Sequence, residues 1–284
     1  MEPALVDQRS PWRSLSCFVL RHVLRREQLT ATIPGLDLRV RAYARDVMGR
    51  HLYKRGLHEQ VLSTFVLREL RLRDDAVALD IGANLGWYSL LLARRWPRAR
   101  IHAFEPEPRN LALLRSNLQR NGITNVTVHG AAVAERDGAM QFFPYAEKNM
   151  GRHSLVPQAG CTPITVPVVT LDGFLQQQRL DPADVQFVKI DVEGYELPAL
   201  QGARSLLAAK PRILAEFAPK YVRSDGDRGR GYAPRLSRDP AAGRHRERLH
   251  GADVRAARVR PRRTWRCVLL VRRGKSGDVP AVLR

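Results

Sequence analysis

Between residues 76 and 217, short apolar runs alternate along the chain with segments in which apolar residues recur every three or four positions. The apolar runs cover 76–80, 99–106, 125–133, 184–191 and 211–217. The segments of helical spacing cover 87–96, 108–122 and 195–210. Short apolar runs are typical of buried strands, whereas the wider spacing is typical of helices that cover them. The alternation predicts an α/β fold, in which helices cover both faces of a mostly parallel sheet.

Two stretches add detail to this pattern. In the second helical segment, Leu111, Leu114 and Leu118 fall on one face, which predicts the side that packs on the sheet. Before the fourth strand, a polar and glycine-rich loop at about 144–163 precedes "PITVPVVTLDGFL" (163–175). The second stretch predicts an added extended segment and a short helix.

Near the N-terminus, residues 11–26 have the spacing of an amphipathic helix with arginines between its apolar positions. The positions at helical spacing are Leu15, Phe18, Val19, His22 and Val23. We expect this helix to pack on the domain through these side chains, although a basic amphipathic helix is also typical of surface binding.

We expect an N-terminal helical segment (1–56), a main domain (57–222) and a tail (223–284) that is set apart by its basic composition. The tail holds 18 Lys+Arg against 6 Asp+Glu, so it carries more than half of the net charge of +20. Only "CVLLV" (267–271) predicts a strand there, and we expect much of the tail to be disordered. Three origins stay open: a nucleic-acid-binding tail, a solvated tail without function, and the product of a shifted reading frame.

The three cysteines are far apart in the sequence and have no metal-binding or disulfide spacing, which is typical of a reducing compartment. The longest apolar stretch near the N-terminus is too short for a signal peptide or a membrane span. The sequence therefore predicts a cytoplasmic protein without a membrane span.

The loop "DIGANLG" (80–86) follows the first strand, where ligands bind in open parallel sheets. A pyrophosphate-binding G-x-G-x-x-G motif starting at Gly82 would need glycines where Asn84 and Trp87 stand, so a dinucleotide is disfavoured. Asp80, the turn at Gly82, the flexible Gly86 and the N–H groups of the next helix suit a ligand with an ammonium and a carboxylate.

The second strand ends in Glu105-Pro106, and a carboxylate there can accept hydrogen bonds from both hydroxyls of a ribose. Small residues around Ala131, after the third strand, would leave room for a flat base. A ligand with an amino acid at one end and a nucleoside at the other is S-adenosylmethionine. Each signal also has an ordinary structural interpretation: Asp80 as a turn residue, and Glu105 as the start of a helix.

Four stretches of the chain resemble the FkbM family of S-adenosylmethionine-dependent methyltransferases. They are "LDIGANLGWYS" (79–89), "FEPEPRNLALLRSNLQRNG" (104–122), "VPVVTLDGFL" (166–175) and "VKIDVEGYELPALQGA" (188–203). The resemblance covers about residues 40–222. It implies a Rossmann-like class I fold with a seven-stranded sheet and methylation of a hydroxyl, commonly on a sugar or a secondary metabolite.

The resemblance has two further implications. "RGLHEQ" (55–60) is similar to the family's segment upstream of the first strand, so Glu59 is expected near the cofactor. Members usually continue beyond the strand at 211–217 with a helix and a final antiparallel pair of strands. Residues 223–284 match neither, so we expect the C-terminal strands to be missing or altered here.

Carboxylates also gather at the fourth and fifth strands. Asp191 and Glu193 in "KIDVEG" and Glu216 in "LAEF" follow the carboxyl ends of neighbouring strands. They could bind acceptor hydroxyls, ligate a divalent cation or supply a base; the sequence gives no metal-binding motif, and none is predicted. The alternative is that Asp191 fixes the loop and Glu193 caps the next helix. His153 is a candidate base, although a solvated loop histidine is the commoner case.

The sequence thus predicts an O-methyltransferase for a small hydroxylated acceptor. An RNA methyltransferase that uses the basic tail, and an inactive cofactor-binding remnant, are the alternatives. Nucleic acid is the less favoured partner because few aromatic residues interleave the arginines of the tail.

Overall fold

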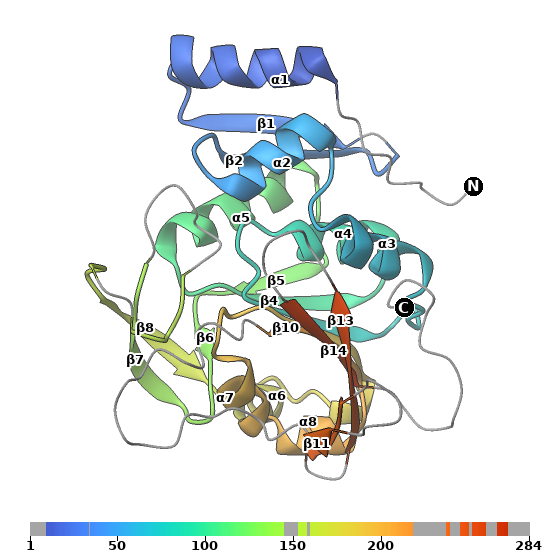
Figure 1. The fold of residues 1–284 in the computed structure, drawn as a ribbon. Helices are drawn as coiled ribbons and strands as arrows, with labels where there is room; N and C mark the ends of the chain where they lie inside the picture. Colours follow the sequence, from blue (N-terminus) through green and yellow to red (C-terminus); the bar gives the residue numbers. More distant parts are fainter. Residues whose placement is uncertain are drawn as a thin grey trace.

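A computed structural model describes residues 10–33, 35–144, 153–157 and 160–217, together with four later strands at 237–238, 245–249, 252–259 and 266–271. For those four strands, the description covers the course and pairing of the backbone. The parallel sheet lies at the centre, between two layers of helices (Figure 1).

Nine strands of the described chain form the central sheet, in the order β11-β12-β13-β14-β10-β9-β3-β4-β5. Five run parallel: β3 (Val77–Ile81), β4 (Arg100–Phe104), β5 (Val126–His129), β9 (Val185–Ile190) and β10 (Arg212–Phe217). The chain moves outward from β3 to β5 and then returns to β9 on the other side of β3. Such a reversal leaves a crevice at the carboxyl ends of the central strands. The predicted α/β, Rossmann-like fold is confirmed.

The two faces of the sheet are covered by different helices, as period-two alternation along the strands requires. Ala78 packs with α3 (Gln60–Arg68), α4 (Trp87–Arg95) and α5 (Pro108–Arg120). Val77, Leu79 and Ile81 pack with α6 (Leu171–Gln177), α7 (Glu196–Gln201) and α8 (Arg204–Ala208). Because the central strands are buried on both faces, their sequences are nearly continuous apolar runs.

The sequence predicted one of the described C-terminal strands, at 267–271, and missed the three before it. The structure places β14 (Arg266–Val271) antiparallel to β10, and β13 (Ala252–Val259) antiparallel to β14. β12 (His245–Leu249) and β11 (Ser237–Arg238) extend this edge. An antiparallel pair therefore follows β10 after all. Arginines interrupt the apolar pattern of β13, so pattern alone could not identify a strand that pairing with β14 defines. The predicted disorder and origin of the tail concern residues mostly outside the described ones and stay predictions.

Three expectations inside the main domain need correction. On α5 the buried leucines are Leu113, Leu114 and Leu118, while Leu111 is only half-buried. The predicted helix at 195–210 is two helices, because the chain turns at Gly202, where a Cβ would meet the backbone oxygen of Ala134 at 2.2 Å.

The predicted strand at 125–133 is likewise divided, into β5 and β6 (Ala132–Val133). β6 belongs to a separate small sheet with β7 (Gly138–Phe142) and β8 (Ile164–Val169). β8 and α6 confirm the predicted extended segment and short helix. The loop before them lies largely outside the described residues.

The N-terminal part consists of α1 (Pro11–Phe18), which continues as the π-helix η1 (Val19–Val23), then the hairpin β1 (Gln28–Ile33) and β2 (Leu38–Tyr43), and α2 (Val47–Arg55). The sequence did not predict the hairpin. Helix α1 forms where expected, but its predicted packing side is wrong: Cys17 and Leu20 face the body, whereas Leu15 and Phe18 point outward and are 53% and 56% exposed. In Figure 1, α1 lies across the outer side of this part.

Candidate functional site

A cavity of about 520 Å³ lies at the carboxyl ends of β3, β4, β9 and β10. Its floor comes from the strand ends, and its N-terminal wall comes from α2 and the loop before α3. Of the predicted site residues, those that line it are Glu59, Asp80, Gly82, Asn84, Glu105, Pro106, Ala131, His153, Asp191, Glu193 and Glu216. The sequence thus selected residues that the fold brings together from positions up to 157 apart in the chain.

Gly82 occupies the tightest point of the first strand-to-helix turn. Its φ is +77°, and a Cβ there would lie 1.9 Å from the backbone oxygen of Asp191. Its N–H and that of Ala83 both donate to the backbone oxygen of Phe104, at 3.0 and 2.9 Å. The turn is therefore fixed between β4 and the end of β9, where only glycine fits.

The remainder of the loop reaches the cavity at Asn84 but not at Gly86. Asn84 has a φ of +52°, and its N–H donates to Oε2 of Glu105 at 2.7 Å. Gly86 has a φ of +93° and precedes α4, where a Cβ would meet Cδ1 of Leu114 at 2.4 Å. Gly86 is not among the residues that line the cavity, and its place in the fold is this close contact with α5.

Asp80 and Glu105 are almost completely buried beneath the cavity. Asp80 accepts a hydrogen bond from the hydroxyl of Ser89 at 2.6 Å, and burial raises the pKa of its carboxyl to about 6. Glu105 accepts from the N–H groups of Asn84 and Glu107. Burial raises the pKa of Glu105 to about 8, although these two hydrogen bonds lower it. Neither residue is a helix N-cap, because Gly86 is the N-cap of α4 and Glu107 is the N-cap of α5.

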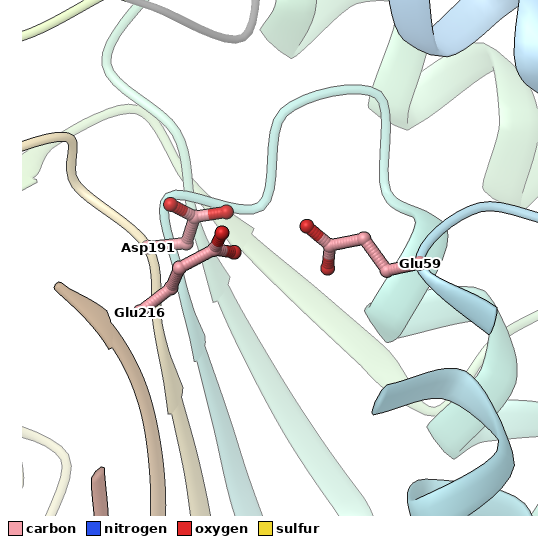
Figure 2. Close-up of side chains that lie close together, drawn as sticks. All are labelled: Glu59, Asp191 and Glu216. Carbon is pink, nitrogen blue, oxygen red and sulfur yellow. The ribbon is translucent and has the colours of Figure 1, made fainter. Parts of the chain in front are cut away.

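Three more carboxylates converge at the β9–β10 end of the cavity, next to Asp80, which pairs with Lys189 across β3 and β9. Figure 2 shows Asp191 and Glu216 directed from the ends of β9 and β10 toward Glu59, which precedes α3. One oxygen atom of each lies within 4.8 Å of those of the other two. Such a set could ligate a divalent cation through oxygen, the ligand that hard cations prefer. The sequence predicted no metal, and this stays a prediction.

A buried lysine already compensates part of this negative charge. Nζ of Lys189, which is 1% exposed, lies 3.5 Å from Oδ2 of Asp191 and 5.0 Å from the centre of the Tyr88 ring. Burial alone would lower the pKa of Lys189, but the carboxylates of Asp191 and Glu59, with others nearby, raise it above its ordinary value. The ammonium therefore stays charged, and it offsets the repulsion between the carboxylates.

Tyr88 connects this cluster to the helix after the glycine turn. Its hydroxyl donates to Oε2 of Glu59 at 2.6 Å, and burial together with Glu59 raises its pKa. Glu59 itself has a φ of +43°. The sequence did not identify Tyr88, because an aromatic residue at the start of an apolar helix has the same pattern as a core residue.

Glu193 lines the cavity, but it does not cap the following helix. Its φ is +47°, and its backbone oxygen accepts from Oγ of Ser154 at 2.9 Å. The carboxylate that holds the start of α7 belongs to Glu196, which accepts from the N–H of Gly194. The helix-capping alternative for Glu193 is therefore wrong.

His153 is not a solvated loop residue. It is 9% exposed, lines the cavity and packs 6.2 Å from the ring of Phe142. Burial, with a smaller contribution from Arg109, lowers the pKa of His153 to about 4. Its imidazole is therefore neutral at physiological pH and can accept a proton.

Three basic residues of the wall were missed by the sequence analysis: His51 and Arg55 of α2, and His58. Burial, together with neighbouring Arg55 and His58, lowers the pKa of His51 to about 4. No local pattern indicates that α2 would reach the carboxyl ends of the strands, because its position depends on the unpredicted hairpin.

The strand order, the glycine turn and the acidic residues at the strand ends define a Rossmann-like nucleoside-binding protein. Residues 80–249 match the model of the methyltransferase FkbM domain family, which is more than half of the chain. The chain belongs to this family of methyltransferases.

Several characterised proteins are similar. The chain is 25% identical over 192 residues to the hexuronic acid methyltransferase AglP of Haloferax volcanii, covering 68% of this chain and 75% of that protein. It is 24% identical over 183 residues to the 2-O-methyltransferase NoeI of Sinorhizobium fredii, covering 58% and 70%. It is 28% identical over 147 residues to methyltransferase 1 of Beauveria bassiana, covering 45% of this chain but only 59% of that protein. The crystal structure of methyltransferase FkbM from Methylobacillus flagellatus is 22% identical, with a TM-score of 0.44 over 78% of this chain and 52% of that one.

Proposed function

We propose that this methyltransferase acts on a hydroxyl of a small acceptor, such as a sugar or a secondary metabolite. The observation that carries the proposal is the composition of one cavity. Asp80, Glu105, Asp191, Glu216 and neutral His153 all line it. A hydroxyl needs a group that orients it and a group that takes its proton, and carboxylates and imidazole do both.

In this proposal, the cofactor-binding groups are those near β3 and β4. Asp80 accepts from the ammonium of the amino acid end, and Glu105 accepts from the ribose hydroxyls. The turn at Gly82, with Asn84 and Pro106, lets the chain approach closely, and Gly86 supports the start of α4. Ala131 leaves room for the base, and Glu59 closes the cavity from the other side. When bound, S-adenosylmethionine supplies an electrophilic methyl group on a positively charged sulfur.

The acceptor-side groups are Asp191, Glu193, Glu216 and His153. The side chain of Asp191 is 29% exposed, whereas Glu216 lies deeper at 4%, so Asp191 is the more accessible to an acceptor. We infer that Asp191 orients the acceptor hydroxyl and that the proton passes to a carboxylate or to His153. Most of the rate gain would come from positioning the hydroxyl, because methyl transfer is an in-line displacement.

Two relatives support the class of acceptor. The names of AglP and NoeI describe transfer to hexuronic acid and to a 2-O position, which are hydroxylated acceptors. The predicted cytoplasmic location agrees with such a role and stays a prediction.

The proposal is tested by isotope-labelled methyl transfer to a panel of hexuronic acids, neutral sugars, hydroxylated metabolites and RNA. We expect labelling of a hydroxylated small molecule, and a fall in kcat of at least about tenfold in Asp191→Asn. Calorimetric titration with S-adenosylhomocysteine, with NAD as a control ligand, establishes whether the protein is competent to bind. Labelling of RNA alone would favour the alternative function, that of an RNA methyltransferase. Binding without any transfer would favour an inactive cofactor-binding protein.

A further inference from the structure

The outer side of α1 and η1 carries an apolar patch that nothing in the described chain covers. Trp12, Leu15, Phe18, Val23 and Leu24 are 78%, 53%, 56%, 65% and 56% exposed. The described residues expose six large hydrophobic side chains, and these are five of them. Singly exposed apolar residues are ordinary, but their concentration on one short segment indicates an interaction surface.

The body of the protein holds this segment with the patch directed outward. Ser10 caps α1 by accepting from the N–H of Arg13, and Cys17 packs in a small cluster with Leu29 and Ala44. The hydroxyl of Tyr53 also donates to Oγ of Ser16 on the inner side. The inward face therefore consists of small and medium side chains, and the larger apolar side chains are left on the solvent side.

The charge of α1, η1 and their flanking residues indicates the kind of partner that the apolar patch would bind. Residues 10–26 contain four arginines and His22 but no Asp or Glu, and Arg25 and Arg26 are exposed beside the patch. A basic amphipathic helix with Trp, Phe and Leu on its apolar side is typical of helices that lie in the interface of an anionic bilayer. A two-fold dimer through this face would instead bring two sets of arginines together, which is repulsive.

We propose that α1 and η1 dock this methyltransferase on an anionic lipid surface. The apolar side chains would enter the boundary between headgroups and acyl chains, while the arginines would contact lipid phosphates. The segment lies along the surface and does not cross it: α1 and η1 together have 13 residues, and no helix in the described part of the chain is long and apolar enough to span a bilayer. Peripheral attachment would place the enzyme where a lipid-linked or membrane-dissolved acceptor is concentrated.

The first experiment is flotation of the full chain with vesicles of phosphatidylcholine, alone or mixed with phosphatidylglycerol. We expect flotation with the anionic vesicles and a partition coefficient at least about tenfold lower in the double variant Trp12→Ser, Phe18→Ser. Val61→Ser is the matched control, since Val61 is the one other exposed large apolar residue in the described chain and lies outside the patch. The variant Arg25→Gln, Arg26→Gln should reduce the preference for anionic over neutral vesicles.

Tryptophan fluorescence distinguishes insertion of the apolar side chains into the bilayer from electrostatic attraction to its surface. Among the tryptophans of the described residues, Trp12 is exposed whereas Trp87 and Trp96 are buried, so vesicles should shift the emission of the wild type to the blue. The shift should be lost in Trp12→Phe, which should still float. Unfolding midpoints of all variants verify that they are folded.

Three outcomes would overturn the proposal. The first is absence of flotation with anionic vesicles. The second is equal flotation of the double variant, which would assign binding to another basic part of the chain, such as residues 223–284. The third is self-association that depends on Trp12 and Phe18 without vesicle binding, which would make the patch an interface between copies. The measurement needs neither cofactor nor acceptor, so its result is independent of the acceptor proposed above.

Discussion

The cavity has two neighbouring ends, the β3–β4 end with Asp80 and Glu105 and the β9–β10 end with Asp191 and Glu216, and the fold holds their carboxylates in different ways. Asp80 and Glu105 are fixed by hydrogen bonds from Ser89 and from backbone N–H groups of the loop and of α5. Asp191 and Glu216 lie with Glu59 around the ammonium of Lys189.

This difference indicates the role for which each end of the cavity is suited. Backbone N–H groups orient Glu105 without neutralising it, and Asp80 accepts from the Ser89 hydroxyl and is only partly compensated by Lys189, so burial still raises the pKa values of both carboxyls. Such groups suit fixed hydrogen bonds to a ligand of constant shape. A lysine close to several carboxylates instead lowers the cost of negative charge, and it leaves them able to accept a proton from an acceptor. The β3–β4 end is therefore suited to ligand recognition, and the β9–β10 end is suited to a change in the protonation of its carboxylates.

Replacing Lys189 by Met should give the largest effect, because it leaves the acceptor-side carboxylates uncompensated. We expect the free energy of unfolding to fall by roughly 3 kcal/mol, a typical value when one member of a buried ion pair is removed. Urea denaturation measures this loss. Lys210→Met is the control, since Lys210 is exposed and should change stability by less than about 0.5 kcal/mol. Equal stability of Lys189→Met and the wild type would show that the carboxylates do not depend on the ammonium.

Replacing Gly82 by Ala tests the junction between the two ends, because a Cβ there would collide with the backbone oxygen of Asp191. Gly122→Ala is the matched control: Gly122 also has a positive φ, +62°, but a Cβ would meet nothing within 4 Å. The control should lose about 1–2 kcal/mol from backbone strain alone. Gly82→Ala should lose more, together with cofactor binding, by denaturation and calorimetry. Identical losses in the two variants would mean that the contact with Asp191 does not constrain the turn.

The four carboxylates compared above were predictable from the sequence, because each stands at the end of an apolar run. Asp80 and Glu216 lie at the carboxyl ends of β3 and β10, Glu105 and Asp191 directly follow β4 and β9, and a parallel sheet brings the carboxyl ends of its strands to one edge. The glycine turn was predictable for a similar reason, since the backbone requirement of Gly82 is local.

The other features of the site and the fold could not be predicted, because they depend on contacts between segments that are distant in the sequence. His51 and Arg55 reach the cavity only because the hairpin β1–β2 and α2 dock beside the sheet. The outward face of α1 could not be predicted from periodicity, since periodicity identifies an apolar side but not the side that meets the body. The same limit applies to Gly202, where close approach to Ala134 interrupts a helix whose sequence is otherwise continuous.

The smallest expected effect concerns the proton on Glu105. Its pKa in the cofactor-free protein is about 8, so the carboxyl is mostly protonated at pH 7. Hydrogen bonds from two ribose hydroxyls would favour the ionised form and lower this pKa, so binding should release a proton. Calorimetry at pH 7 in buffers of different ionisation enthalpy should detect release of up to about one proton. The release should diminish above pH 8, where the free carboxyl is already ionised.

Glu105→Gln keeps the shape of the side chain but removes its titration, so it isolates this proton from those of Asp80 and Glu196, whose pKa values are also raised. The variant should bind S-adenosylhomocysteine about tenfold more weakly, with an affinity that no longer rises with pH toward 8. Stability gives an independent test of the sign. Because the folded pKa of Glu105 lies above its ordinary value of 4.5, wild-type stability should fall relative to Glu105→Gln as pH rises from about 4.5 to 8. If the proton release persists in Glu105→Gln, it comes from another carboxyl whose pKa is raised, such as that of Asp80 or Glu196, and Glu105 is not the group that titrates when the ligand binds.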